Sequence, residues 1–138
     1  DVGVEHALDY VYGYTCMNDV SQRNIQNGDR SGWFRGKSFD TFGPIGLVVV
    51  PAARIGDVQA LDISCRLNGT TVQSSNTRYM IFSVAEMVSF ISRNFTLYPG
   101  DIVLTGTPAG VCPISDGDVV EVEIDGIGTL RNPVSDPA

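Results

Sequence analysis

Two tight-turn signals, each between two runs of strand-forming residues, constrain the fold of this chain more than any other feature. Asn68-Gly69 separates residues 60–67 from residues 70–74, and Asn-Gly is the strongest short-range signal for a β-hairpin. Asp125-Gly126 separates the alternating residues 118–124 from residues 127–132 in the same way. Because a hairpin pairs its strands antiparallel, these segments predict antiparallel sheet in the middle and at the end of the chain.

Two segments have the pattern of a helix. Residues 4–12 place apolar side chains on one helical stripe and charged side chains on the other faces. Residues 83–93 begin with Ser83 and have Glu86 three positions later, which is the capping-box signature of a helix start. We therefore expect a short amphipathic helix at the beginning of the chain and a second helix after residue 82.

Three further strands and one long loop complete the expected elements. We expect mostly buried strands at 14–20 and 47–50, a short strand at 102–105, and a surface loop over the polar, glycine-containing residues 24–36. The predicted fold class is α+β, a β-rich mixed-sheet roll.

Composition excludes several classes of partner. The chain has 16 acidic and 9 basic residues and a net charge of −7, so nucleic acid and anionic lipid surfaces would repel it. Its longest apolar stretch, residues 45–53, is too short to span a membrane. Cys16, Cys65 and Cys112 lie nearly fifty residues apart, a spacing that indicates neither a disulfide framework nor a zinc site and favours a cytoplasmic protein.

Lys37 is the chain's only lysine and lies among Trp33, Phe34, Phe39 and Phe42. Two interpretations are open at this stage. The lysine can be an ordinary loop residue whose stem covers apolar surface while its ammonium stays in water. Alternatively, it can be a partly desolvated cation that faces a developing oxyanion or carries a proton.

Asp19 ends an apolar segment, and a carboxylate there needs a partner. If a helical turn begins near Ser21, the side chains of Asp19, Arg23 and Gln26 project on one side. Glu121 and Glu123 share one face of a strand, which we interpret as a half-solvated face rather than a metal-binding pair.

Several motifs in order complete the sequence pattern. They are Gly13-Tyr14-Thr15, Asn18-Asp19-Val20-Ser21, residues 33–44, Met80-Ile81-Phe82, residues 99–102 and residues 104–111. Together they closely resemble the catalytic domain of the fumarylacetoacetate hydrolase family over essentially the whole chain. The resemblance implies a β-roll fold, a homodimer and one Mg²⁺ or Mn²⁺ that binds a small 2-oxo or enol carboxylate substrate.

The resemblance also implies roles for individual residues. Asp19 matches a metal-binding carboxylate, and Arg23 and Gln26 match residues that line the substrate and a metal-bound water. Lys37 matches the active-site lysine. The remaining matches are Thr41, which borders the metal site, and Thr107 with Gly106, in the loop that receives the substrate carboxylate.

Some features of the family are not found in these residues. The family's Glu-x-Glu metal ligands, and the catalytic histidine of its hydrolases, are expected upstream of Asp1. Residues 1–134 are accordingly expected to form a catalytic domain that lacks its upstream part, followed by a tail at 135–138. His6 lies on the polar side of the first expected helix, and no triad is predicted around it.

The resemblance implies an enzyme that hydrolyses a C–C bond of an acylpyruvate or a fumarylacetoacetate-like β-diketo acid through a metal-bound enolate. Two alternatives within the family are a 2-hydroxyhepta-2,4-diene-1,7-dioate isomerase and an oxaloacetate-type decarboxylase. An alternative of another class is an inactive fragment with a structural or dimer-forming role.

Overall fold

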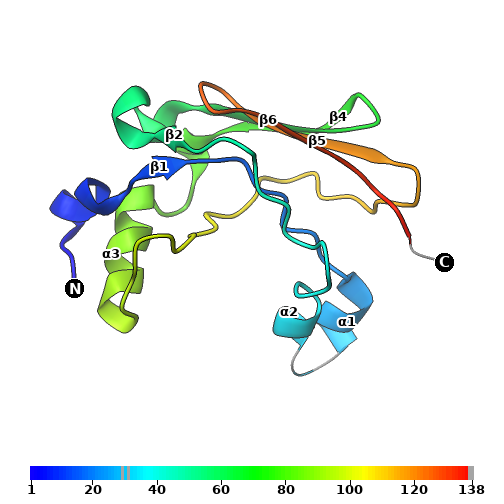
Figure 1. Cartoon of the computed structure of the whole chain (residues 1–138), viewed down its shortest axis with the longest axis horizontal. Coiled ribbons are helices and arrows are strands. Elements are labelled where there is room, and N and C mark those ends of the chain that lie inside the picture. Colours follow the sequence, from blue (N-terminus) through cyan, green and yellow to red (C-terminus); the bar gives the residue numbers. More distant parts are fainter. Residues whose placement is uncertain (29, 31, 137–138) are drawn as a thin grey trace.

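A four-stranded antiparallel sheet is the largest layer of the computed structural model, which describes residues 1–28, 30 and 32–136 (Figure 1). Its strand order is β4-β3-β5-β6. The strands are β3 (Asp62–Leu67), β4 (Thr70–Asn76), β5 (Val119–Ile124) and β6 (Gly128–Pro133). Both predicted hairpins are confirmed. In the first turn Asn68 and Gly69 have φ of 51° and 79°, and the residues with the lowest cost for that left-handed backbone are glycine and asparagine.

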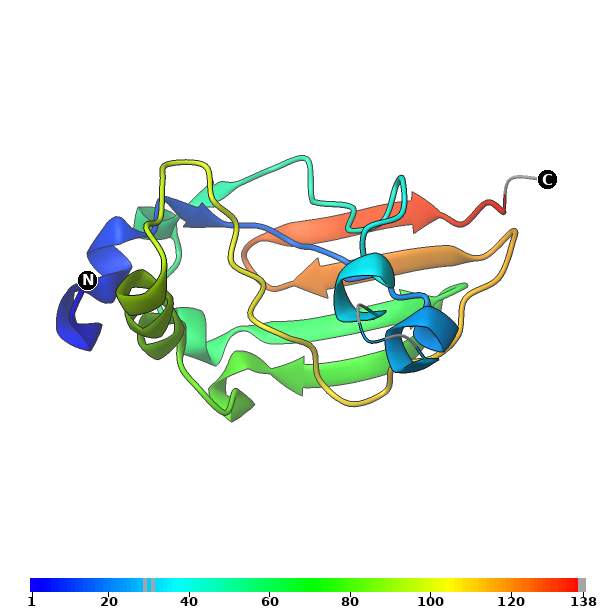
Figure 2. The same ribbon diagram turned by 90° about the horizontal axis from the view of Figure 1, so that it is seen from below.

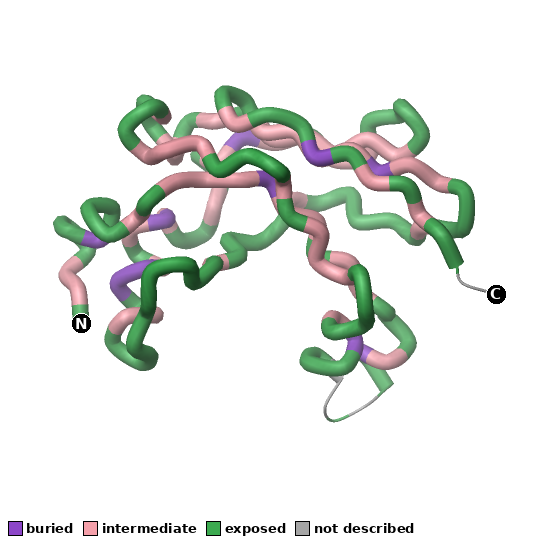
Figure 3. The backbone as a smooth tube through the Cα atoms, viewed as in Figure 1, coloured by how far each residue is buried: buried purple, intermediate pink, exposed green. Residues whose placement is uncertain are grey.

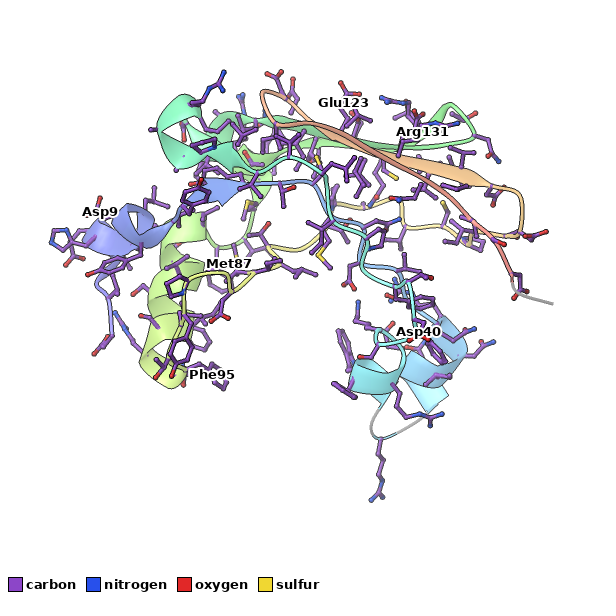
Figure 4. All side chains as sticks on the ribbon, in the orientation of Figure 1. Asp9, Asp40, Met87, Phe95, Glu123 and Arg131 are labelled. Atoms are coloured by element: carbon purple, nitrogen blue, oxygen red, sulfur yellow. The ribbon has the colours of Figure 1, made fainter. Side chains whose placement is uncertain are left out.

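The outer face of this sheet carries an ion-pair network. Arg66 Nη1 lies 2.6 Å from Glu123 Oε2, and its Nε lies 3.3 Å from Glu121 Oε2. Arg131 Nε lies 3.7 Å from the other oxygen of Glu121. In Figure 4 the labelled Glu123 and Arg131 both project away from the helices. The interpretation of Glu121 and Glu123 as a half-solvated strand face is therefore confirmed.

A second sheet is much smaller than expected. β1 (Gly13–Tyr14) and β2 (Val50–Pro51) pair antiparallel, and a single bridge joins Met17 to Ile45. The prediction of strands over 14–20 and 47–50 is wrong except at Tyr14 and Val50. Prolines 44 and 51 have no N–H to donate, so a continuous ladder cannot form between the two segments. Leu47 is 103% exposed, so the expected burial of the second segment is also wrong.

Residues 102–105 form no strand, and Ile102 and Leu104 are exposed. This expectation is also wrong. Residues 102–112 instead form an extended loop that runs beneath the four-stranded sheet (Figure 1). Pro99, Gly100 and Pro108 interrupt the strand pattern in this region.

The first predicted helix exists as a 3₁₀ helix, η1 (Val4–Tyr10), rather than an α-helix. Gly3 begins it without a side-chain cap, and 3₁₀ geometry is common in such short pieces. The second predicted helix is confirmed as α3 (Val84–Asn94). Ser83 Oγ accepts from the N–H of Glu86, and the Glu86 side chain accepts from the N–H of Ser83. Ala7 of η1 packs against Val84 and Val88 of α3 to form a small buried core.

Residues 24–36 are not the predicted loop, because two short helices lie there. α1 (Arg23–Gly28) and α2 (Gly32–Arg35) form a pair that we call the α1–α2 lobe; residues 29 and 31 of the expected loop lie outside the described residues. The N–H of Gln22 donates to the carbonyl of Gly36 at 2.8 Å and closes the lobe. Local hydrogen bonds stabilise these two short helices, whose sequences lack the periodic apolar pattern that marks longer helices.

The other short helical turns connect strands. They are η2 (Ala52–Arg54), η3 (Val58–Ala60) and η4 (Thr77–Tyr79). Figures 1 and 2 show α3 near one end of the four-stranded sheet and the α1–α2 lobe near the other, both on the same face. The N-terminus lies at one end of the molecule, and β6 runs towards the opposite end (Figure 2). Of the expected tail at 135–138, Asp136 donates its N–H to Asp116 at 3.0 Å, and residues 137–138 lie outside the described part.

Burial is concentrated where the elements cross. Figure 3 shows buried positions along the sheet and α3, whereas most of the α1–α2 lobe is exposed. The buried apolar residues at the sheet are Cys16, Val120 of β5 and Leu130 of β6. The α+β class is confirmed. Among the described residues no helix is long and apolar enough to cross a membrane.

The capping box of α3 generates a stability prediction. Replacing Ser83 with Ala in the full-length protein removes the acceptor for the Glu86 N–H, so we expect the free energy of unfolding to fall by about 1 kcal/mol. Urea denaturation followed by circular dichroism measures this change. Ser115→Ala removes a hydroxyl that makes no hydrogen bond among the described residues and serves as the control. Equal midpoints for the two variants would contradict the assigned role of the cap.

Candidate functional site

Lys37, Asp19 and Ser21 meet in one cluster beside the α1–α2 lobe. The Lys37 ammonium donates to Asp19 Oδ2 in an ion pair and to Ser21 Oγ at 3.0 Å. Ser21 Oγ in turn donates to the backbone carbonyl of Asp19 at 3.2 Å. A cation, a carboxylate and a hydroxyl from two parts of the chain are therefore held together.

Backbone hydrogen bonds explain why these residues meet. Lys37 follows α2, and its N–H donates to the carbonyl of Phe34 at 3.2 Å. The Gln22 to Gly36 bond places the end of α2 beside the residues that follow Asp19. The N–H of Asn18 donates to the carbonyl of Pro44 at 3.1 Å, so the segment before Asp19 is anchored as well.

The Lys37 side chain is partly buried and in contact with an anion and an aromatic ring. Its side chain is only 25% exposed, whereas that of Asp19 is 44% exposed. Its ammonium lies 5.9 Å from the centre of the Trp33 ring, within the range of a cation–π contact. Lys37 is thus a partly desolvated cation with an anionic partner, and its surroundings are those that suit a charge-stabilising or proton-carrying lysine.

Arg23 and Gln26 lie on one turn of α1, as the spacing predicts. Arg23 Nη1 donates to Gln26 Oε1, and Gln26 is the buried residue of this helix, with 4% exposure. Asp19 lies outside the helix, because α1 begins at Arg23. The single helical face that would have carried all three side chains is therefore not formed.

Thr41 lies in the loop after α2 with a backbone φ of 68°. A left-handed backbone is unusual for a β-branched residue and costs conformational energy. Phe39 and Phe42 flank it, and their rings lie 5.3 Å apart. The loop is therefore held in a defined conformation close in sequence to Lys37.

Gly106 and Thr107 belong to the loop beneath the sheet, away from the α1–α2 lobe in sequence. Gln73 Nε2 of β4 donates to Thr107 Oγ1 at 2.9 Å and to the carbonyl of Pro108 at 2.7 Å. Gly106 has a φ of 99°, which requires glycine. The described contacts thus join Thr107 to β4 and Lys37 to Asp19, and they include no direct contact between the two groups.

Two residues of this arrangement were not found by sequence reasoning. Ser21 and Gln73 hold Lys37 and Thr107 respectively. Ser21 lies two residues after Asp19, and only this proximity could have suggested it. Nothing in the sequence distinguishes Gln73 from any other polar residue of a strand.

The described residues provide only part of a metal site. The Asp19 carboxylate is a hard oxygen donor of the kind that Mg²⁺ and Mn²⁺ prefer. Among residues 1–28, 30 and 32–136, however, no group of three or more His, Cys, Asp or Glu side chains could hold a metal ion. Asp19 fits as one ligand, but the donors present do not complete a coordination shell.

The arrangement can bind an anion and hold a proton. Lys37 offers three N–H donors, of which Asp19 and Ser21 accept two. Its remaining donor can reach an anionic oxygen next to the Asp19 carboxylate. His6 pairs with Asp9 at 3.5 Å on η1, and Figure 4 shows the labelled Asp9 and the labelled Asp40, which follows the α1–α2 lobe, at opposite ends of the molecule. No histidine base therefore accompanies Lys37 within the described residues.

Residues 1–135 match the family described as Fumarylacetoacetate (FAA) hydrolase C-terminal. A 2,4-didehydro-3-deoxy-L-rhamnonate hydrolase of Sphingomonas sp. is 43% identical over 98% of this chain and 50% of its own length. The chain spans about half the length of the curated relatives that it matches.

Solved structures share the fold. The crystal structure of 2-hydroxyhepta-2,4-diene-1,7-dioate isomerase from Mycobacterium marinum has a TM-score of 0.92 and 47% identity, covering 98% of this chain and 52% of that one. A fumarylpyruvate hydrolase from Pseudomonas aeruginosa, in complex with Mn²⁺ and pyruvate, has a TM-score of 0.91 and 39% identity over 97% of this chain and 58% of that one. The predicted β-rich α+β fold class is confirmed, and the matches over nearly all 138 residues show that this chain belongs to the fumarylacetoacetate hydrolase family.

Proposed function

We propose that the full protein is a divalent-metal-dependent enzyme that hydrolyses a C–C bond of an acylpyruvate or a fumarylacetoacetate-like β-diketo acid. The observation that carries this proposal is the chain's only lysine, partly desolvated and paired with Asp19 in a conformation fixed by Ser21. Relatives that act on similar acids support the substrate class, and the P. aeruginosa hydrolase with its Mn²⁺ and pyruvate supports the metal and the 2-oxo acid.

Asp19 is proposed as one ligand of Mg²⁺ or Mn²⁺, with the other protein ligands outside residues 1–138. When bound, such an ion supplies positive charge that binds the oxygens of a 2-oxo acid and stabilises negative charge on them. Thr41 borders this site in the proposal. The contacts that maintain its strained backbone would also keep the loop in place next to the metal ligand.

The chain's own residues have complementary roles. The main-chain N–H groups around Gly106 and the Thr107 hydroxyl receive the substrate carboxylate. Gln26 is held by Arg23, so its amide can orient the water that attacks the substrate. In hydrolysis the water oxygen bonds to the acyl carbon, the C–C bond breaks, and its electron pair passes to the pyruvyl half as an enolate. Lys37 stabilises that enolate oxygen and delivers the proton that completes pyruvate, while one proton of the attacking water restores the Lys37 ammonium and the acyl half leaves as a carboxylic acid.

A second candidate is isomerisation, in which the same enolate forms by loss of a proton and is protonated at another carbon. The observation that favours it is that no histidine accompanies Lys37 among the described residues, because proton transfer by one lysine needs no base to activate water. The M. marinum isomerase supports this alternative. Decarboxylation of an oxaloacetate-type acid would use the same binding groups.

The proposed enzyme is a cytoplasmic homodimer. Support for the homodimer comes from large apolar side chains in contact with solvent, such as Trp33, Leu47 and Ile81, because exposing them in a lone chain is unfavourable. Support for the cytoplasm comes from three free thiols, Cys16, Cys65 and Cys112.

Asp19→Asn tests the metal ligand. This change keeps the shape of the side chain and removes its charge, so we expect the Kd for Mn²⁺, measured by titration calorimetry of the full-length protein, to rise at least about tenfold. Asp40→Asn removes another exposed carboxylate of the same region and is the matched control. Wild-type Mn²⁺ affinity in Asp19→Asn would show that Asp19 is not a ligand.

Lys37→Met tests the role of the ammonium. A group that acts in the transition state should lower kcat much more than it raises KM when removed, and we expect a loss in kcat of about 10²-fold or more. Arg54→Met, which removes an exposed cation from η2, is the control. An unchanged kcat refutes this role. A loss of Mn²⁺ affinity as large as that of Asp19→Asn would place Lys37 in the metal site instead.

The reaction is identified by incubating the full-length protein with Mg²⁺ and acetylpyruvate, oxaloacetate or a hydroxydiene-dioate separately. Enol absorbance and product analysis by NMR follow each mixture. We expect acetate and pyruvate from acetylpyruvate. Double-bond migration without fragmentation supports the isomerase instead, release of CO₂ from oxaloacetate supports the decarboxylase, and inactivity towards all three acids supports a structural role.

A further inference from the structure

The loop that carries Gly106 and Thr107 contacts the sheet at an irregular point. Cys65 pairs with Gln73 and Arg66 pairs with Thr71, so Val72 has no partner in the β3–β4 ladder. Such a bulge interrupts the ladder and bends the strand. The loop packs at this bulge, since a Cβ on Gly110 would lie only 2.1 Å from the carbonyl oxygen of Val72.

Gln73 fixes the same loop from the neighbouring position. Its amide donates to both Thr107 and Pro108, and its Cγ lies 3.1 Å from the position of a Gly110 Cβ. The side chain of Gln73 therefore projects towards the loop. Directly opposite residues of an antiparallel pair project to the same face of a sheet, so the side chain of Cys65 also projects to the face that carries the loop.

Cys112 lies two residues beyond Gly110, so the loop brings it to the same region. Both cysteines are free thiols, with Cys65 half-buried and Cys112 exposed. Burial raises the pKa of the Cys65 thiol, and the charge of Cys112 raises it further. This direction agrees with the strand register and the loop contacts, which bring the two cysteines to the same face of the sheet.

We propose that Cys65 and Cys112 form a reversible intramolecular disulfide, a covalent modification site that ties the loop of residues 106–112 to strand β3. The two cysteines come from elements that already pack together, as a disulfide bond requires. This inference rests on the packing of the loop and is independent of the proposed function. In a reducing compartment such a bond is transient and responds to oxidants.

Oxidised glutathione, a small-molecule disulfide, is a sufficient oxidant. The exposed Cys112 meets it first, and its thiolate attacks one sulfur, so the S–S bond of the oxidant breaks and one glutathione thiolate leaves and takes up a proton. The Cys65 thiolate then attacks the Cys112 sulfur and displaces the second glutathione. Two protein thiols are oxidised to one disulfide, and one oxidised glutathione is reduced to two glutathione thiols.

Trypsin separates the three cysteines, which makes the site directly measurable. Cleavage after arginine places Cys16 in a peptide that ends at Arg23, Cys65 in residues 55–66 and Cys112 in residues 94–131. The full-length protein is equilibrated with mixtures of oxidised and reduced glutathione, its remaining thiols are alkylated, and it is digested without reductant. We expect mass spectrometry to find residues 55–66 linked to residues 94–131, and Cys16 alkylated.

Thermal unfolding gives a second, independent readout. Because the bond constrains the unfolded chain between residues 65 and 112, we expect Tm to rise by about 5 °C or more on oxidation and to return with dithiothreitol. Cys112→Ser should lose both the linked peptide and the Tm shift. Cys16→Ala should keep both, because the buried Cys16 lies in a different contact, with its thiol donating to Gly128.

Three results would overturn the proposal. The first is glutathione retained on Cys112 while Cys65 remains alkylated in the wild-type protein. The second is a disulfide between the Cys112 peptides of two chains. The third is the absence of any linked peptide at the most oxidising glutathione ratio.

Discussion

The pairing of β3 with β5 is the interaction on which the rest of the structure depends. It joins residues 62–67 to residues 119–124, so two local hairpins become one four-stranded sheet. A single hairpin is only marginally stable in water, whereas three or more strands with one apolar face can persist. The chain between the two hairpins, which includes α3 and the loop with Thr107, must consequently leave the sheet after β4 and return to it at β5.

The two faces of this sheet carry different side chains, charged on one face and apolar on the other. Arg66 and Arg131 neutralise Glu121 and Glu123 on the outer face, while Val120 is buried on the inner face. The alternation of residues along β5 follows from the strand period of two. The inner face is thereby left to pack against the helices and the loop, and the site residues all approach from that side.

The candidate site combines firmly held and strained parts. Lys37 is placed by an ion pair, a hydroxyl and an aromatic ring, whereas Thr41 is held in a left-handed conformation. Strain of this kind persists only where neighbouring contacts fix the chain. Both features agree with a site whose side chains are held before the substrate binds, which lowers the cost of orienting them in the transition state.

The sequence by itself determined the local elements, because a turn such as Asn68-Gly69 and a cap such as Ser83 with Glu86 act within a few residues. It also singled out Asp19 and Lys37 as candidates. Only the tertiary structure decided that these two side chains pair, that residues 23–28 and 32–35 are helical, and that residues 102–105 form a loop instead of a strand. The same holds for Gln73 on Thr107 and for Cys65 beside the loop of Cys112. These features depend on contacts between distant segments, and no pattern within a short stretch of sequence encodes which distant partner it meets.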